Sequence, residues 1–289
     1  MIRPPKVNDA LAVDANGAEI GYYGPYLLRS AYQPIVRRRG DTLVLTAFEG
    51  LIRPSRGGFD IPPARFFPLV DEPDLLFVEC MCRALHIRNY AAVRPHGRYL
   101  FVNINPANYA EIAVIEREFN YLVAVLPEFG IGPERIICEI VETDAQDPDL
   151  LQYLVAKLMD CGFQVALDDF GRQSSNFERY VALKPGIVKI DREYFVAVAE
   201  QASERRLLLS VMDTFMRHGT RVLVEGVETR AELDLGSELG VSLFQGFGIA
   251  RPQLLPREFP LSYPLPGEEL QEQPHEVISE EARMLPTSP

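Results

Sequence analysis

Two kinds of segment meet in DLLQYLVAKLMDCGFQVALDD, residues 149–169. The first part, 149–162, repeats apolar residues at the spacing of an amphipathic helix. The second part, 163–169, is a short apolar run that ends in two carboxylates. A helix followed directly by a short apolar strand is typical of βαβ units, in which the sheet is mainly parallel.

The same alternation continues on both sides of this stretch. Helical spacing recurs at 73–93, 203–219 and 230–240. Strand candidates lie at 31–36, 42–52, 99–105, 135–142, 163–169, 186–191, 221–227 and 242–246. Such strands alternating with helices predict an α/β fold, a TIM-like (β/α)8 barrel. An open doubly wound sheet is the alternative, but no Gly-rich phosphate loop follows an early strand.

The composition limits the classes of function. Apolar residues make up 47% of the 289 residues, which permits a sizeable core. The formal net charge of −12 argues against binding to a nucleic-acid polymer or an anionic membrane. The N-terminus lacks the apolar core of a signal peptide, and no window reaches the roughly 18 apolar residues of a membrane span. The four cysteines show no paired CxxC spacing, so we expect a cytoplasmic protein with reduced thiols.

The two ends of the chain differ from its middle. We expect an N-terminal extension over residues 1–26 that leads into a helix at GPYLLRS, residues 24–30. The barrel domain is expected to cover 27–262. Residues 263–289 are acidic, contain proline and have few large apolar residues, which predicts a flexible tail.

Polar residues stand at or near the end of nearly every predicted strand. In a closed parallel barrel, ligands meet the C-terminal ends of the strands, so residues placed there are candidates for function. These residues are Glu49, Asn103, Glu139, Glu142, Asp168, Asp169, Lys189, Asp191, Glu225, Glu228 and Gln245. A single carboxylate in such a place is more typical of a capping or surface group, but its recurrence on successive strands indicates a site.

Several carboxylates at one barrel mouth would repel each other strongly unless protons or cations neutralised them. Carboxylate and amide oxygens without His or Cys suit Mg²⁺, Mn²⁺ or Ca²⁺ rather than zinc. We do not expect a histidine ligand, because the four histidines fall on predicted helices, loops or the tail. They are His86, His96, His218 and His275.

Asp168 and Asp169 would point to opposite faces of a continuous strand, so both reach one centre only if the chain turns there. Two divalent ions in such a centre would imply in-line displacement at phosphorus by an activated water. Lys189 fits this chemistry as a group that orients the water or pairs with a phosphate. The alternative for Lys189 is a structural salt bridge to a neighbouring carboxylate.

A series of short motifs, in the expected order, resembles the EAL-type cyclic di-GMP phosphodiesterases over about residues 27–260. The motifs are YQPIV (32–36), FEGLIRP (48–54), FFPLVDEPDLL (66–76), FVNINP (101–106), CEIVET (138–143), ALDDFG (166–171), VKIDREYF (188–195), VEGVET (224–229) and QGFGIARP (245–252). The resemblance implies a barrel whose first strand is antiparallel to the others, a homodimer, and hydrolysis of cyclic di-GMP to linear pGpG.

The resemblance also implies roles for individual residues. Metal binding, with two ions of Mg²⁺ or Mn²⁺, is implied for Glu49, Asn103, Glu139, Asp168, Asp169 and Glu225. The catalytic groups would be Lys189, Glu225 and Glu49, with Lys189 and Glu225 near the attacking water. Gln33, Arg53 and Gln245 would bind substrate, Gln245 within the metal–water network, and Glu142 and Glu228 would support loops.

The sequence departs from the family at two informative places. Glu-Ala-Leu reads Glu49-Gly50-Leu51, which keeps the acid and is expected to free the backbone beside it. After Asp169 the chain reads GRQSSNF, and Gln173 stands where the family has a glycine in loop 172–176. The interpretation is a metal-dependent cyclic di-GMP phosphodiesterase. The alternative is a catalytically impaired domain that serves as a cyclic di-GMP receptor or binds protein partners.

Overall fold

Eight strands close into a ring at the centre of the computed structural model, which describes residues 7–93, 97–141, 147–171, 176–254 and 259–268. Around the ring the strands are β3 Tyr26–Arg39, β11 Leu243–Phe244, β10 Arg221–Val224, β9 Ile187–Ile190, β8 Gln164–Phe170, β7 Ile136–Ile140, β6 Tyr99–Ile104 and β4 Thr42–Arg56. Pairing of β3 with β4 closes the ring. The predicted TIM-like barrel is therefore confirmed.

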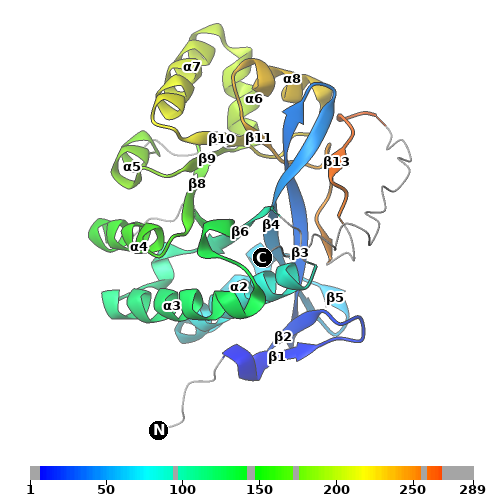
Figure 1. Ribbon diagram of the computed structural model, residues 1–289, viewed down its shortest axis with the longest axis vertical. Coiled ribbons are helices and arrows are strands. Elements are labelled where there is room, and N and C mark those ends of the chain that lie inside the picture. The colour runs from blue at the N-terminus through cyan, green and yellow to red at the C-terminus, as the bar shows by residue number, and fades with distance from the viewer. Residues whose placement is uncertain (1–6, 94–96, 142–146, 172–175, 255–258, 269–289) are drawn as a thin grey trace, which may run out of the picture.

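The first strand of the ring runs against the others, as the family resemblance implies. β3 pairs antiparallel with both β4 and β11, whereas every other neighbouring pair in the ring is parallel. β3 and β4 are also much longer than the other strands, and Figure 1 shows them as two long arrows that extend past the ring.

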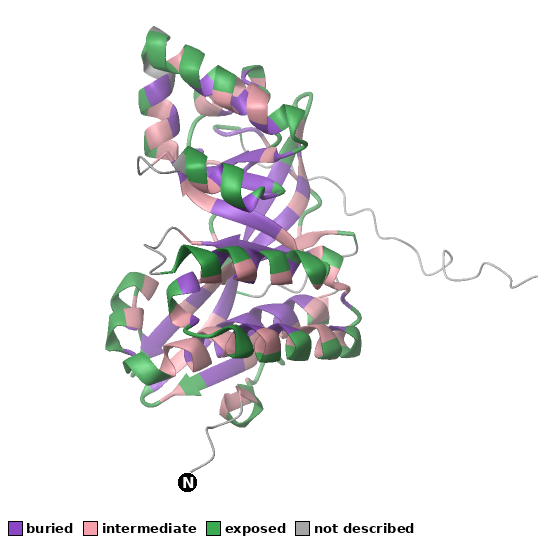
Figure 2. Ribbon diagram, turned by 90° about the vertical axis from the view of Figure 1, so that its left-hand side faces the viewer, coloured by how far each residue is buried: buried purple, intermediate pink, exposed green. Residues whose placement is uncertain are grey.

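Helices cover the outside of the ring, and Figure 2 shows exposed residues on their outer faces around largely buried strands. The helices are α1 Pro63–Phe66, α2 Leu75–Val93, α3 Ile112–Val125, α4 Pro148–Asp160, α5 Asn176–Leu183, α6 Arg192–Glu200, α7 Ala202–Arg217 and α8 Arg230–Glu238. Local capping fixes several of their starts. Asp147 accepts from two backbone N–H groups at the start of α4, and Thr229 and Glu232 form a capping box at α8.

Short elements complete the described part of the chain. Five further strands are β1 Leu11–Val13, β2 Glu19–Tyr23, β5 Phe59–Asp60, β12 Gln253–Leu254 and β13 Ser262–Tyr263. The 3₁₀ helices are η1 Val7–Ala10, η2 Phe67–Leu69, η3 Glu72–Asp74, η4 Pro106–Asn108, η5 Leu126–Phe129 and η6 Pro133–Arg135. Within the described ranges, no helix has the length and hydropathy that crossing a membrane requires.

The predicted helix at 24–30 is wrong, because this segment is the start of strand β3. Tyr26, Leu28 and Ser30 are buried while the residues between them are half-buried, which is the two-residue period of a strand. The buried face packs on α2 through a separate core that includes Leu28, Val78 and Met81. β2 pairs with the same part of β3, so residues before 27 extend the sheet.

A plug of apolar side chains fills the inside of the ring. One residue comes from each of the eight strands: Ile35, Ala47, Phe101, Ile137, Ala166, Ile187, Leu223 and Leu243. All are buried, so the barrel interior at this level is a packed core rather than a pore. Because side chains alternate along a strand, the residue two positions further on shares the same inward face.

Candidate metal centre

A single layer of polar side chains lies next to the plug at the C-terminal ends of the parallel strands. Each member is two residues beyond the plug residue of its strand, or two before it on the antiparallel β3. The layer consists of Gln33, Glu49, Asn103, Glu139, Asp168, Lys189, Glu225 and Gln245. All eight were predicted as site residues, and the barrel places them on one inward level.

Lys189 lies in the middle of this layer and is only 2% exposed. Its Nζ makes close contacts with Glu139 Oε1 and Glu225 Oε1. It lies 3.2 Å from Asp168 Oδ1 and 4.0 Å from Glu49 Oε1. One ammonium therefore faces four carboxylates. Lys189 thus forms the salt bridges that the sequence offered as the alternative to a role with water or phosphate.

The pKa values follow from burial and from this excess of negative charge. Burial raises the pKa of Glu225 to about 8, and it raises the pKa of Glu139 well above its usual range. Burial alone would lower the pKa of Lys189, but the surrounding carboxylates outweigh burial and raise it. Burial also opposes ionisation of Asp168, yet the Lys189 ammonium lowers the net pKa of that carboxyl. The centre thus needs protons or cations to be neutral.

The donor atoms of the layer fit hard divalent cations. Oxygens of Glu139, Asp168 and Glu225 lie within 4.8 Å of one another, close enough to hold one ion. Glu139 Oε2 is buried and accepts no hydrogen bond from the residues that the structure describes. A buried carboxylate oxygen without a partner is costly unless an ion or a proton binds it. Carboxylate oxygens together with the Asn103 amide match Mg²⁺ or Mn²⁺ better than zinc.

At the two aspartates, where the sequence indicated a turn, β8 contains a bulge. Leu167 pairs with Val188 and Phe170 pairs with Ile190, so β8 has one more residue than β9 between these pairs. Asp169 has φ of 53°, in the left-handed region that a non-glycine residue rarely adopts. Because of this bulge, the side chains after Asp168 no longer alternate regularly between the two faces of β8. Asp169 is not one of the three residues whose oxygens meet within 4.8 Å.

On the side of the layer formed by β3, β4 and β11, amide side chains accompany Glu49, and Arg53 lies further along β4. Gln245 Nε2 donates to Glu49 Oε2 at 2.8 Å, and Gln33 Nε2 donates to the Ala250 carbonyl at 3.1 Å. Arg53 follows Glu49 by four residues on the same face of β4. Its Nη1 donates to the Ile52 carbonyl at 2.9 Å, and partial burial lowers its pKa.

Glu228 does not reach the centre. Its carboxylate pairs with Arg192 at 3.3 Å, and its backbone N–H donates to Glu232. Both contacts hold the segment after β10 against α6 and α8. The predicted loop-supporting residue Glu142 and the substituted Gln173 lie outside the described residues. The same holds for the rest of loop 172–176, apart from the α5 residue Asn176.

The sequence did not reveal why a glycine stands at position 50. The expected freedom of the backbone is wrong, because Gly50 sits within regular β4, paired with Tyr32. A Cβ at position 50 would lie 2.8 Å from Cγ of His86 on α2. The His86 ring is itself held by a 2.8 Å hydrogen bond between Nδ1 and Ser30 Oγ. Glycine is therefore required by close packing on the outer face of β4.

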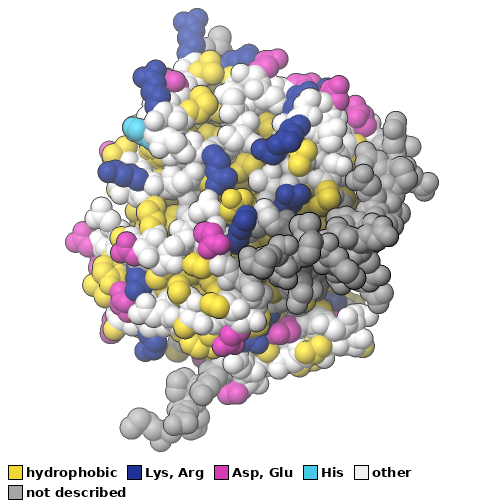
Figure 3. Space-filling model, in the orientation of Figure 1, with side chains coloured by type: hydrophobic (Ala, Val, Ile, Leu, Met, Phe, Trp, Pro, Cys, Tyr) yellow, Lys and Arg dark blue, Asp and Glu magenta, His cyan; other side chains and the backbone are white. Residues whose placement is uncertain are grey.

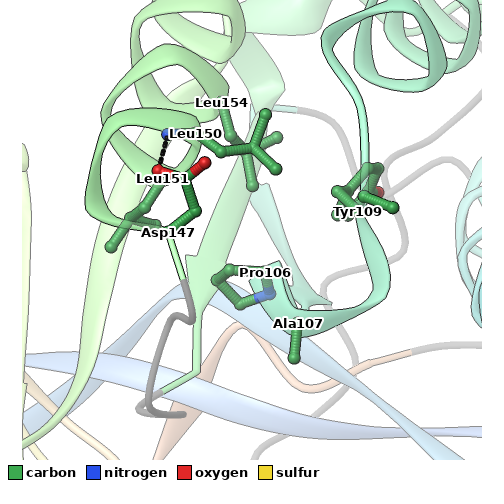
Figure 4. A pocket seen from close by; sticks show the side chains of 8 residues that line it. Pro106, Ala107, Tyr109, Asp147, Leu150, Leu151 and Leu154 are labelled. Carbon is green, nitrogen blue, oxygen red and sulfur yellow. Dashed lines mark hydrogen bonds between the residues drawn. The ribbon is translucent and has the colours of Figure 1, made fainter.

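A cavity of about 240 Å³ lies outside this layer, between η4 and the start of α4 (Figure 4). Most of the residues that line it are of apolar type, with Pro106, Tyr109 and Leu154 among them. Its carboxylate, Asp147, already caps α4 through the N–H groups of Asp149 and Leu150. The cavity thus offers no comparable set of converging polar groups. On the outer surface, Figure 3 shows basic, acidic and hydrophobic side chains interspersed on one face.

Fold and centre together define a TIM-like barrel with an acidic, lysine-containing site at its C-terminal mouth. Residues 27–252 match the EAL domain, and the chain belongs to this family. It is 28% identical over 239 residues to "Cyclic di-GMP phosphodiesterase RocR" of Pseudomonas aeruginosa, covering 80% of this chain and 58% of RocR.

Solved structures of EAL proteins are similar to this chain in fold. Klebsiella pneumoniae BlrP1, in a manganese and cyclic di-GMP complex, matches with a TM-score of 0.67 and 25% identity over 78% of this chain and 56% of BlrP1. A standalone EAL protein from Vibrio cholerae O395, bound to cyclic di-GMP, matches with a TM-score of 0.69 and 25% identity, covering 81% of this chain and 95% of that one. The chain spans 30% to 58% of the length of the first curated relatives that it matches.

Proposed function

We propose that the chain is a metal-dependent phosphodiesterase that hydrolyses cyclic di-GMP to linear pGpG. The observation that carries the proposal is the complete inward layer, in which four carboxylates surround one buried lysine. Related EAL proteins are named for this activity or were solved with this nucleotide, which supports the choice of substrate. The proposal assigns the activity to the barrel domain predicted over residues 27–262, with 1–26 as an extension. The predicted tail 263–289 must start later than residue 263, because Tyr263 lies in β13 and Leu265 is buried in the core.

The residues proposed to hold two Mg²⁺ or Mn²⁺ ions are Glu49, Asn103, Glu139, Asp168, Asp169 and Glu225. When bound, such ions draw charge from a phosphate and lower the pKa of a water molecule. The manganese and cyclic di-GMP complex of BlrP1 supports the choice of a divalent cation. The all-oxygen donor set supports it from this chain, as does Glu139 Oε2, which has no hydrogen-bond partner among the described residues.

The chain's own groups account for proton handling and orientation. Lys189 stays charged because four carboxylates surround it, and it can stabilise a phosphate oxygen or orient the attacking water. Glu225 lies against the same ammonium, so its carboxylate is placed beside that water. Glu49 is held by Gln245, and Gln33 and Arg53 line the side from which substrate would approach.

The second candidate is a cyclic di-GMP receptor or protein-binding domain without turnover. The observation that favours it is the replacement of a family glycine by Gln173 in the loop after the aspartate pair. A side chain at this position restricts a backbone that the family keeps flexible. A homodimer and a cytoplasmic location belong to both candidates, and light scattering measures the oligomeric state.

One assay separates the candidates. The purified chain is incubated with cyclic di-GMP and Mn²⁺ or Mg²⁺, and pGpG is measured by chromatography, with EDTA as the metal-free control. We expect pGpG that depends on the cation. Tight binding of cyclic di-GMP without pGpG would favour the receptor, and absence of both binding and turnover would contradict both candidates for this nucleotide.

A further inference from the structure

Arg29 lies directly opposite Arg53 in the pairing of β3 with β4. The register runs from Gln33 and Glu49 in the polar layer, through Ala31 and Leu51, to Arg29 and Arg53. Alternate residues of a strand share a face, so both arginines project on the inward face, beyond the centre. Four residues of strand correspond to about 13 Å between the centre and this pair.

The Asp60 carboxylate lies near both guanidinium groups, and Glu49 also acts on Arg53. Asp60 on β5 pairs with Ser55 of β4, and its Oδ1 lies 3.2 Å from Arg29 Nη2. Burial lowers the pKa of Arg53, and the carboxylates of Glu49 and Asp60 oppose this effect. Asp60 is 78% exposed, so it neutralises the pair only weakly. Like charges directly opposite each other in a sheet are unfavourable, and a further acceptor would relieve this repulsion.

The donors of Arg29 are largely unused. The Asp60 contact occupies Nη2, and the buried Nε donates to no acceptor among the residues that the structure covers. Arg29 is one-third exposed, so a ligand can reach part of its side chain. Its planar fork matches a pair of adjacent acceptor atoms better than a single point charge.

We propose that Arg29, together with Arg53, reads the edge of a guanine base through its O6 and N7 acceptors. This inference rests on the proposed substrate. The two phosphates of a cyclic dinucleotide share one small ring, so both stay near the centre while the bases project from it. A base edge therefore suits a pair about 13 Å along the strand, and arginine is the usual partner of guanine O6 and N7.

The test compares two ligands by calorimetry in Ca²⁺: cyclic di-GMP and its 7-deaza analogue, which lacks the N7 acceptor. For Arg29→Gln we expect affinity for cyclic di-GMP to fall about tenfold or more. The analogue should bind the unchanged chain more weakly by a similar factor, and Arg29→Gln should lose little further affinity for it. Arg29→Lys keeps the charge but not the fork, and should not restore tight binding.

Arg37→Gln is the matched control, because Arg37 is exposed at the opposite end of β3. It should leave both affinities unchanged. Equal affinity of Arg29→Gln and the unchanged chain for cyclic di-GMP would overturn the proposal. The proposal would also be overturned if Arg29→Gln weakened binding of the 7-deaza analogue by the same factor as it weakened binding of cyclic di-GMP. Binding by the unchanged chain without production of pGpG would refute hydrolysis alone. No binding by the unchanged chain would refute both proposals.

Discussion

Glu49 and Gly50 are neighbours on β4, yet they face opposite sides of the sheet under different constraints. Glu49 faces inward, within 4.0 Å of Lys189 Nζ, and accepts a hydrogen bond from Gln245. Gly50 faces outward, where the His86 ring leaves no room for a methyl group. The comparison shows that the Glu49-Gly50-Leu51 motif keeps its carboxylate on the inward face of β4, while the change from alanine to glycine alters packing on the outward face.

Removing the inward side chain should have the largest effect. Glu49→Ala deletes a proposed metal ligand and leaves Gln245 without its acceptor, so we expect turnover to fall by about a hundredfold to a thousandfold. The measurement is pGpG production at saturating Mn²⁺, with circular dichroism to confirm folding. Turnover close to that of the unchanged chain would show that Glu49 is not in the reacting centre.

Adding a methyl group on the outward face should have the next largest effect. Gly50→Ala restores the family's Glu-Ala-Leu, yet its Cβ would lie 2.8 Å from His86 Cγ. Overpacking costs about 1–3 kcal/mol. The smaller unfolded-state gain from replacing glycine, about 0.4–1 kcal/mol, should not offset it. We expect a lower free energy of unfolding, measured in urea, and slower turnover.

The double variant Gly50→Ala with His86→Ala makes this prediction specific. Removing the ring opens the space that the methyl group needs. The double variant should therefore lose less unfolding free energy than the two single variants lose together. Additive losses of unfolding free energy would show that Gly50 and His86 are not coupled.

The pH dependence of the metal-free protein should be smaller but distinctive. The pKa of Glu225 rises from 4.5 to about 8 on folding, so between these values the folded state binds more protons than the unfolded state. The stability contributed by protonated Glu225 is then lost as pH rises toward 8. Glu139 acts in the same direction, whereas Asp168 and Lys189 titrate outside this window.

The measurement is the melting temperature from pH 5 to 9 in EDTA, which should fall as pH rises. Glu225→Gln should flatten part of the slope, and Mn²⁺ should stabilise the protein more at pH 8 than at pH 6, because protons compete for the same oxygens. A melting temperature that rises over this range would contradict the assignment.

The smallest effect is expected outside the layer. Glu228→Gln removes a half-exposed ion pair with Arg192, and such pairs contribute about 0–1 kcal/mol. We expect a small loss in thermal stability and a change in turnover well below that of Glu49→Ala. A comparable loss of turnover would mean that Glu228 belongs to the reacting centre.

The inward layer was predictable because a strand end is a local signal in the sequence. Glu139, Asp168 and Lys189 each follow an apolar run, and a parallel barrel brings all such ends to one mouth. A departure from regular strand geometry at the two aspartates was also expected, since adjacent carboxylates cannot both face inward from a regular strand, although the expected turn is a bulge within β8.

Packing between distant segments was not predictable in the same way. The segment 24–30 was expected to be helical, but its state is decided by pairing with β4 and burial against α2. The sequence analysis considered His86 only as a possible metal ligand and did not expect it to be one. Nothing near His86 in the sequence indicates that its ring packs beside Gly50. Tertiary contacts of this kind override local pattern.

The apolar plug beneath the centre also governs exchange with solvent. Buried side chains such as Ile35, Phe101 and Ile187 fill the ring below Lys189. The filled ring leaves the C-terminal rim as the side from which the layer can be reached. Under the proposed function, a nucleotide bound across that rim would cover the cations beneath it. Cations should then enter before the nucleotide, and their release should be slowest while the nucleotide is bound.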